Sequence, residues 1–190
     1  MIRILALCFA IVLSAPRLAA TEPSTAGDLT PAGCDPAKVL GVDSCVKCHA
    51  AEVNQWKTTP HAQTFETLHR TPEAKEIASR LGLRSVKRNE TCTQCHYTLA
   101  EQRGKHRAVA GVSCESCHGA AKDWVELHSD YGGPDVTRVT ESAAHRQQRI
   151  DASIAEGMNN PASLYLVARQ CLACHTTPHE ELVNVGGHVP

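Results

Sequence analysis

The sequence predicts a mainly α-helical fold with extensive loops, and three observations support this prediction. No run of alternating, β-branched residues suggests a sheet. Several short segments combine helix-capping residues with an apolar stripe of helical period. The chain is also poor in aromatic residues, with two Phe, two Trp and three Tyr among 190 residues. Its own side chains would therefore form a thin core, which suggests that other apolar groups complete the fold.

The clearest predicted helix covers residues 72–81. Thr71 can cap its N-terminus, Pro72 suits its first turn, and Gly82 suits the position just after its end. Three further helices are expected: residues 50–56, residues 141–157, and a last helix that Pro161 opens and that leads into Cys171.

One five-residue pattern, C-x-x-C-H, occurs four times along the chain. The copies are Cys45–Cys48–His49, Cys92–Cys95–His96, Cys114–Cys117–His118 and Cys171–Cys174–His175. This pattern is the attachment signature of c-type haem: two thiols bond to the macrocycle and the histidine becomes an axial ligand of the iron. Four copies predict four covalently bound haem c groups, around which a compact multihaem cytochrome c fold would form.

Zinc binding is the alternative interpretation of these motifs. Paired C-x-x-C sequences can build a structural zinc site, and a single one can act as a redox dithiol. Neither role requires a histidine directly after the second cysteine. Histidine occupies only 11 of the 190 positions, so its presence at all four of these positions favours haem.

The N-terminus has the pattern of a secretory signal peptide. Arg3 provides a positive charge, residues 4–13 form a short apolar run, and small residues follow. We expect cleavage after Ala20, with Ala26 as the second choice, and therefore a periplasmic protein. An uncleaved anchor helix is the alternative, but the run is short for a membrane span. No later segment is apolar enough to cross a bilayer.

The expected organisation is a signal peptide (1–20), an extended leader (21–40) and one tetrahaem cytochrome c domain (41–190). Ten cysteines would suggest disulfides in an exported protein, but eight belong to haem motifs and Cys8 leaves with the signal. Cys34 is left over as a spare linker cysteine.

The charge balance points to protein partners and not to nucleic acid. Loss of residues 1–20 lowers the basic side chains from 19 to 17, against 20 acidic ones. Haem propionates make the mature protein more negative still. A negative surface disfavours nucleic acid and suits transient docking with redox protein donors and acceptors.

Histidine is the expected sixth ligand of the haem irons. The mature chain has one methionine, Met158, against seven histidines outside the motifs. A second histidine keeps the haem potential low, whereas methionine raises it. The distal candidates, in falling order, are His61, His128, His188 and His106; His145 and His179 follow, and His69 ranks last as a surface residue.

Two of these candidates lie near tryptophans. His61 follows Trp56 in the pattern W-x4-H, and His128 lies one helical turn after Trp124. His188 follows two glycines, which permit a close backbone approach. We expect His61 to serve a different haem from the one that His49 holds, because both ligands of one iron must approach from opposite faces.

Three segments resemble a known family: residues 45–68, the sequence Gly111-Val112-Ser113-Cys114-Glu115-Ser116-Cys117-His118-Gly119, and residues 171–175. They are similar to the tetrahaem cytochrome c family that accepts electrons from hydroxylamine oxidoreductase in ammonia oxidisers. The similarity covers residues 41–130 well and 165–190 weakly. It implies that His61 and His128 are distal ligands and that the haems stack in pairs.

The chain departs from that family in two respects. The family has a histidine just before its last motif, whereas residues 164–170 contain none. Another histidine, such as His145, His179 or His188, would then have to replace it. The family's second haem has no sixth ligand, and here His106 is a candidate for that position.

The function expected from these observations is that of a periplasmic electron carrier in a respiratory chain, with no catalytic residues of its own. Two alternatives stay open. One haem, with the second motif as the suspect by resemblance, could reduce a small nitrogen or oxygen species. The protein could also be a docking subunit of a larger redox complex. We further expect the protein without haem to be largely disordered.

Overall fold

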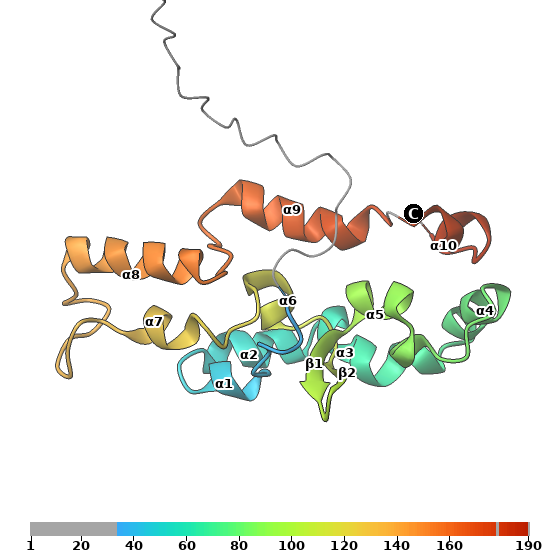
Figure 1. Cartoon of the computed structure of the whole chain (residues 1–190), viewed down its shortest axis with the longest axis horizontal. Coiled ribbons are helices and arrows are strands. Elements are labelled where there is room, and N and C mark those ends of the chain that lie inside the picture. Colours follow the sequence, from blue (N-terminus) through green and yellow to red (C-terminus); the bar gives the residue numbers. More distant parts are fainter. Residues whose placement is uncertain (1–33, 178, 190) are drawn as a thin grey trace, which may run out of the picture.

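Short helices in two layers make up most of the structure, a computed structural model that describes residues 34–177 and 179–189 (Figure 1). The expected signal peptide and most of the expected leader lie outside these residues. No helix in the described ranges is long and apolar enough to cross a membrane. The mainly α-helical prediction is confirmed.

The larger layer contains the elements between residues 43 and 129. Its α-helices are α1 (Asp43–Val46), α2 (Ala50–Lys57), α3 (Pro60–Thr67), α4 (Pro72–Arg80), α5 (Glu90–His96), α6 (Cys114–His118) and α7 (Val125–Ser129). Two short 3₁₀ helices, η1 (Leu68–Arg70) and η2 (Val86–Arg88), flank α4.

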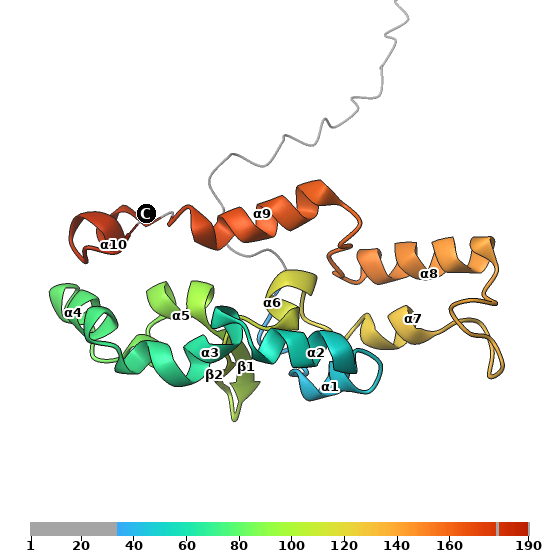
Figure 2. The same cartoon turned by 180° about the vertical axis from the view of Figure 1, so that it is seen from behind.

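The second layer consists of α8 (Ala143–Ala155), α9 (Leu164–His175) and α10 (Glu180–Asn184). Figures 1 and 2 show these helices in a row along one side of the first layer. Helix α8 packs on α7, and α9 packs on α6. The C-terminal quarter of the chain thus faces the haem motifs of the earlier part.

Capping residues explain where the longer helices begin. The Thr71 side chain accepts a hydrogen bond from the Ala74 amide at 3.2 Å, and Gly82 has a positive φ of 66° after the end of α4. Ser142 caps α8 in the same way. The helix expected to open at Pro161 begins later, because Ser163 caps it and Leu164 is its first residue, and it is not the last helix, since α10 follows it.

A β-hairpin corrects the expectation that no sheet forms. Strands β1 (Thr98–Gln102) and β2 (Lys105–Ala110) pair in antiparallel register. Arg103 and Gly104 connect them, and both have positive φ values of 54° and 68°. A two-residue turn of this kind suits the twist of a hairpin. The Arg-Gly pair was the only local sequence signal for it.

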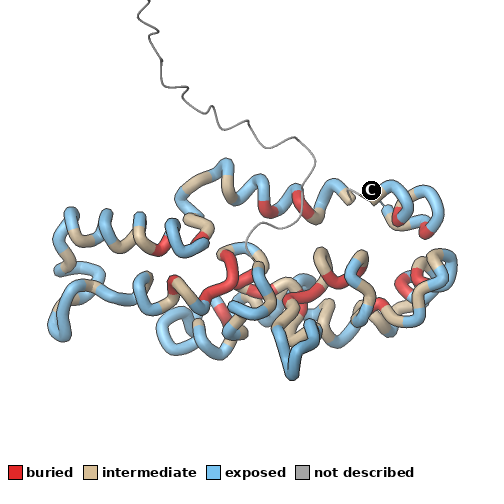
Figure 3. The backbone as a smooth tube through the Cα atoms, in the orientation of Figure 1, coloured by how far each residue is buried: buried red, intermediate tan, exposed pale blue. Residues whose placement is uncertain are grey.

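The core is thin and divided. One apolar cluster gathers Ala74, Ala78, Val86, Cys92 and Tyr97, and a second gathers Ala121, Trp124 and Met158. In Figure 3 the buried segments of both layers lie mainly on the sides that face each other. The few buried side chains agree with the expectation that additional apolar groups complete the interior.

Candidate haem-binding sites

Three of the four motifs lie at the end of a helix whose last residue is the motif histidine. The first motif begins in α1, and His49 is the residue before α2. The second and third motifs form α5 and α6, and the fourth ends α9. One turn of helix brings residues i and i+3 to the same side. The two cysteines of a motif can therefore reach the same macrocycle.

Three of the four motif histidines face a second imidazole. His49 lies opposite His128, with ring centroids 6.2 Å apart and an angle of 22° between the planes. The other two pairs are His61 with His175 at 6.1 Å, and His96 with His188 at 6.0 Å. His61 thus faces the fourth motif and not the first.

These separations fit one metal ion between two imidazoles. An imidazole nitrogen binds a metal at about 2.0 Å, and the nitrogen lies about 1.1 Å from the ring centre. Two rings on opposite sides of one ion therefore have centroids about 6.2 Å apart. In each pair one ring belongs to a C-x-x-C-H motif, so its cysteines are positioned to hold the surrounding macrocycle. The residues present fit haem c.

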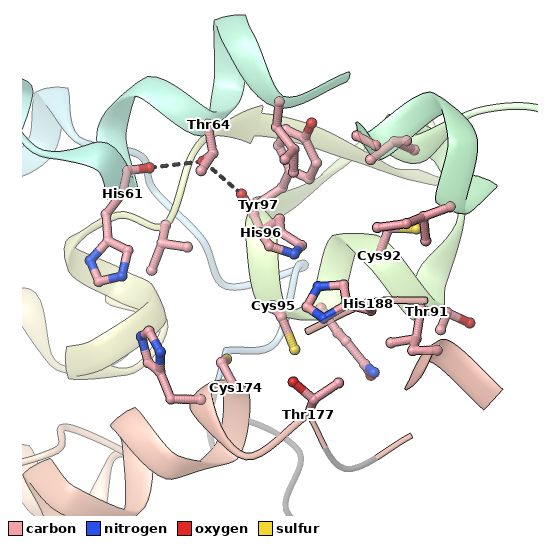
Figure 4. A pocket seen from close by; sticks show the side chains of 18 of the residues that line it. His61, Thr64, Thr91, Cys92, Cys95, His96, Tyr97, Cys174, Thr177 and His188 are labelled. Carbon is pink, nitrogen blue, oxygen red and sulfur yellow. Dashed lines mark hydrogen bonds between the residues drawn. The ribbon is translucent and has the colours of Figure 1, made fainter. Parts of the chain in front are cut away.

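A cavity of about 530 Å³ joins the second and fourth motifs. Its walls include Cys95 and His96 from α5, Cys174 and His175 from α9, and His61. Figure 4 shows His61 and His188 pointing into this space from opposite sides. The cavity thus contains both members of two imidazole pairs, as expected if two neighbouring macrocycles occupy this part of the protein.

The cysteines bring the motifs together in two pairs. Cys45 of the first motif and Cys114 of the third lie within hydrogen-bonding reach of each other. Cys95 of the second and Cys174 of the fourth do the same. The attachment edges of the first and third haems would therefore be neighbours, and so would those of the second and fourth.

One hydroxyl group connects histidines of two different imidazole pairs. Thr64 Oγ1 on α3 donates to the backbone carbonyls of His61, at 2.8 Å, and His96, at 2.9 Å (Figure 4). Since His61 faces the fourth motif and His96 belongs to the second, this threonine fixes the two sites relative to each other.

Gly111 permits a close approach of the chain to His61. A Cβ atom at this position would lie 2.2 Å from the carbonyl oxygen of His61 and 2.6 Å from Thr64 Oγ1. The same carbonyl accepts a hydrogen bond from the Val112 amide at 3.0 Å. The glycine before the third motif therefore serves to position a histidine that faces the fourth.

The buried carboxylate of Glu115 holds the third motif in place. Its side chain is only 1% exposed and accepts hydrogen bonds from the amides of Leu40 and Gly41, at 2.9 and 2.8 Å, and of Ala121, at 2.9 Å. Three amide donors satisfy the buried charge. Glu115 thus joins the residues before α1 to the segment after α6.

Burial favours the form of the histidines that can bind iron. It holds the pKa of His96 and of His128 below the usual range; neighbouring histidines and, for His128, Arg149 are smaller causes. A neutral imidazole has the free lone pair that a metal requires. His188 Nδ1 contacts the carbonyl of Val189 at 2.5 Å, which leaves Nε2 free.

Trp124 carries a buried donor that a haem could satisfy. Its ring meets His128 edge to face, with centroids 5.8 Å apart. Its Nε1 is buried and has no hydrogen-bond partner among the described residues. Buried donors are usually paired, and a haem propionate near His128 would supply the acceptor.

The structure does not bring the remaining histidines to a motif ring. His106 lies on β2 opposite Glu101, on the hairpin that points away from α9 (Figure 1). His145 binds Glu141 at 2.8 Å, and His179 contacts Gln94. His69 is partly buried beside Arg70, although the sequence suggested a surface residue.

Gly186 and Gly187 permit a close approach to Leu81 and Arg80 of the α4 region, and by this route the chain brings His188 to His96.

The leftover cysteine, Cys34, is described in the structure. Burial, followed by the charge of Glu115, raises the pKa of the Cys34 thiol to about 12.

Among the described residues no group of three or more His, Cys, Asp or Glu side chains forms a metal-ion site, so these residues contain no ligand cluster of the kind that the zinc alternative requires.

Comparison with known proteins agrees with this chemistry. Residues 44–119 match the family described as "Cytochrome c554 and c-prime". Cytochrome c-554 of Nitrosomonas europaea is 27% identical over 143 residues, which represent 71% of this chain and 56% of the relative. The chain thus spans little more than half the length of that protein. No solved structure matches the chain significantly. The chain is thus similar to the cytochrome c554 family over residues 44–119, and its C-x-x-C-H motifs are those of c-type cytochromes.

Proposed function

We propose that this protein is a periplasmic tetrahaem cytochrome that carries electrons between redox partners of a respiratory chain. The observation that supports this most strongly is the set of three imidazole pairs with centroids 6.0–6.2 Å apart. Each pair includes the histidine of one C-x-x-C-H motif. This arrangement suits low-potential haems with two histidine ligands, which exchange electrons without binding a substrate.

The chain's own residues would hold and tune the haems. The cysteines of each motif would bond to the macrocycle, and His49, His96, His118 and His175 would be the proximal ligands. His128, His188 and His61 would be the distal ligands of the first, second and fourth haems. The bound haem supplies one-electron redox chemistry, and the protein supplies ligation, burial and orientation.

The proximity of the motifs supports a carrier role. Cys45 lies next to Cys114, and Cys95 next to Cys174, so neighbouring haem edges would give electrons a short route through the protein. The expected net negative charge of the mature chain would guide it to partners with positive patches, and this attraction would weaken as salt increases.

Export and haem content test the proposal together. The full chain would be produced in a host that matures c-type cytochromes, and periplasmic protein would be assayed by the pyridine haemochrome method and N-terminal sequencing. We expect four haems per chain, an N-terminus at Thr21 or Gly27, and reversible reduction at low potential. Fewer than three haems per chain would overturn the proposal.

Cysteine variants provide a matched comparison. Replacing Cys171 and Cys174 with alanine should remove one haem, because both thiols of the fourth motif are lost. Cys34→Ser changes a cysteine outside the motifs and should retain all four haems. An equal haem loss in both variants would show that the assay reports folding and not attachment at the motif.

A further inference from the structure

The third motif differs from the other three in what its histidine faces. The rings of His49, His96 and His175 each have a second imidazole at 6.0–6.2 Å. His118 has no such ring contact among the described residues, and these include all 11 histidines of the chain. The proximal histidine of the third motif therefore has no imidazole opposite it.

Two of the remaining histidines are engaged in other contacts. His145 lies in the first turn of α8, where its Nδ1 contacts Glu141. The main chain of His118 is bonded to Asn159, just beyond the other end of α8. A helix of this length separates the two ends by about 20 Å. His179 contacts Gln94 of the second motif.

The other two lie on the outer parts of the first layer. His106 belongs to a hairpin that extends away from the second layer (Figures 1 and 2). His69 lies in η1, beside Arg70 and the apolar cluster around Tyr97. Neither lies at the contact between α6 and α9, where the third motif is placed.

The helix that passes over the third motif offers no replacement. Helix α9 packs on α6, and its residues 164–170 contain neither histidine nor methionine. Leu166 and Gln170 are its more buried residues in this stretch, whereas Leu164 and Tyr165 are exposed. The side of α9 that turns inward over α6 thus presents leucine and glutamine.

The side chain of Met158 packs in the core. Met158, the one methionine among the described residues, is 8% exposed in the apolar cluster with Ala121 and Trp124. Its neighbour Asn159 bonds to the backbone carbonyls of Cys117 and His118. This segment therefore supports the main chain of the third motif, and the Met158 side chain belongs to the core.

We propose that the haem held by Cys114, Cys117 and His118 has an open sixth position and binds small, neutral diatomic ligands such as carbon monoxide when its iron is ferrous. This inference rests on the tetrahaem assignment above. It places the open position on the third haem, whereas the family resemblance implies the second. The reason is that His188 faces His96 of the second motif, while nothing comparable faces His118.

Carbon monoxide titration of the reduced holoprotein tests this directly. The probe binds an open ferrous haem and does not readily displace a strong histidine ligand. The wild-type protein should bind one carbon monoxide per chain. His61→Ala, His128→Ala and His188→Ala should each bind two, because each removes the ring opposite one other proximal histidine. Haem content, measured separately, should stay at four per chain in all of them.

The three variants assign the open haem by elimination. If His188→Ala still bound one carbon monoxide, the second haem would already be open in the wild type, and the inference would fail. It would fail equally if the wild type bound none or two. A haem count below three would instead refute the tetrahaem carrier, whatever the titration gave.

Substitutions of the other candidates complete the test. His106→Ala, His145→Ala, His179→Ala and Met158→Leu should all bind one carbon monoxide, as the wild type does. A wild type without binding, together with one bound molecule in any of these four, would identify that residue as the ligand of the third haem and overturn the proposal. Ferric spectra should show one high-spin haem in four.

Discussion

His61, near the start of α3, and His175, the last residue of α9, face each other with their ring centroids 6.1 Å apart. One belongs to the first layer and the other to the second. The contact therefore joins a histidine outside the motifs to the fourth motif, the last of the three motifs that follow it in the sequence.

His61→Ala should open one iron without loss of haem, because the thioether bonds of the fourth motif are unaffected. The high-spin fraction should rise by about one quarter of the total haem. The potential of that haem should also rise, since a strong donor to ferric iron is gone. Absorption spectra and a redox titration would measure both. His69→Ala is the control and should change neither. An unchanged low-spin spectrum in His61→Ala would contradict the ligand assignment.

Gly111→Ala should disturb the same site from the other side. The new Cβ would lie 2.2 Å from the His61 carbonyl oxygen, so the start of α3 must move. We expect a loss of about 1–3 kcal/mol in the free energy of unfolding, as is typical of overpacking. Part of the fourth haem should also become high-spin. Thermal melting and absorption spectra would report the two effects.

A second glycine provides the control for that prediction. Gly133 has no positive φ, and a Cβ there would meet Val136 at an ordinary 3.4 Å. Gly133→Ala should therefore leave both the melting temperature and the spectrum close to wild type. Equal behaviour of the two variants would show that the contact between Gly111 and His61 does not position the ligand.

Glu115→Ala should weaken the attachment of the third motif, because the amides of Leu40, Gly41 and Ala121 would lose their acceptor. Buried donors without partners predict a loss of about 2–4 kcal/mol. Glu115→Gln retains one acceptor oxygen and should lose less. Denaturant unfolding would measure the change. Glu126→Ala, at an exposed position on α7, is the control, and equal stability of both alanine variants would refute the role of Glu115.

An ion pair predicts a pH dependence near His128. Hydrogen bonds from Arg149, and then from His145, lower the pKa of Glu141 from 4.5 to about 2. Arg149 also donates to the backbone carbonyl of His128 at 2.7 Å. A carboxylate with a depressed pKa stabilises the fold above its unfolded pKa. That stabilisation is lost as pH falls from about 4.5 to about 2.

Melting curves of wild type and Glu141→Gln between pH 7 and pH 2 would test this dependence. The wild type should be more stable above pH 4.5, and the difference should shrink towards pH 2 because Glu141 then becomes protonated. Hydrogen exchange of the α7 and α8 amides should follow the same course. A constant difference across the whole range would contradict the assignment to Glu141.

The features that sequence predicts well are local. The C-x-x-C-H motifs predict the proximal histidines from five consecutive residues, and α4 begins at Pro72 because Thr71 and the proline together specify a helix start. The contacts between His61 and His175, and between His96 and His188, could only be ranked as candidates. The two members of each pair are about 90 or more residues apart in the sequence, and helical or strand periodicity does not predict contacts between residues so far apart.

The residues that sequence reasoning missed act through distant contacts. Nothing near Glu115 indicates that its carboxylate binds amides before α1, and nothing near Thr64 indicates that its hydroxyl joins the carbonyls of His61 and His96. Gly111 lies inside a segment that resembles the family, but the need for glycine at this position comes from its close contact with the backbone of α3. The sequence did not predict the hairpin, because its turn is Arg-Gly and its strands lack the usual β-branched pattern.

The three imidazole pairs also determine which segments of the chain depend on one another to complete their sites. Drawn as arcs along the sequence, the links 49 to 128, 61 to 175 and 96 to 188 all cross one another. Because the arcs cross, any segment shorter than 49–188 that contains one complete pair also contains a histidine whose partner lies outside it, so it cannot fold as an independent module with all its pairs complete. A growing chain must extend to His175 before the fourth site can close and to His188 before the second can.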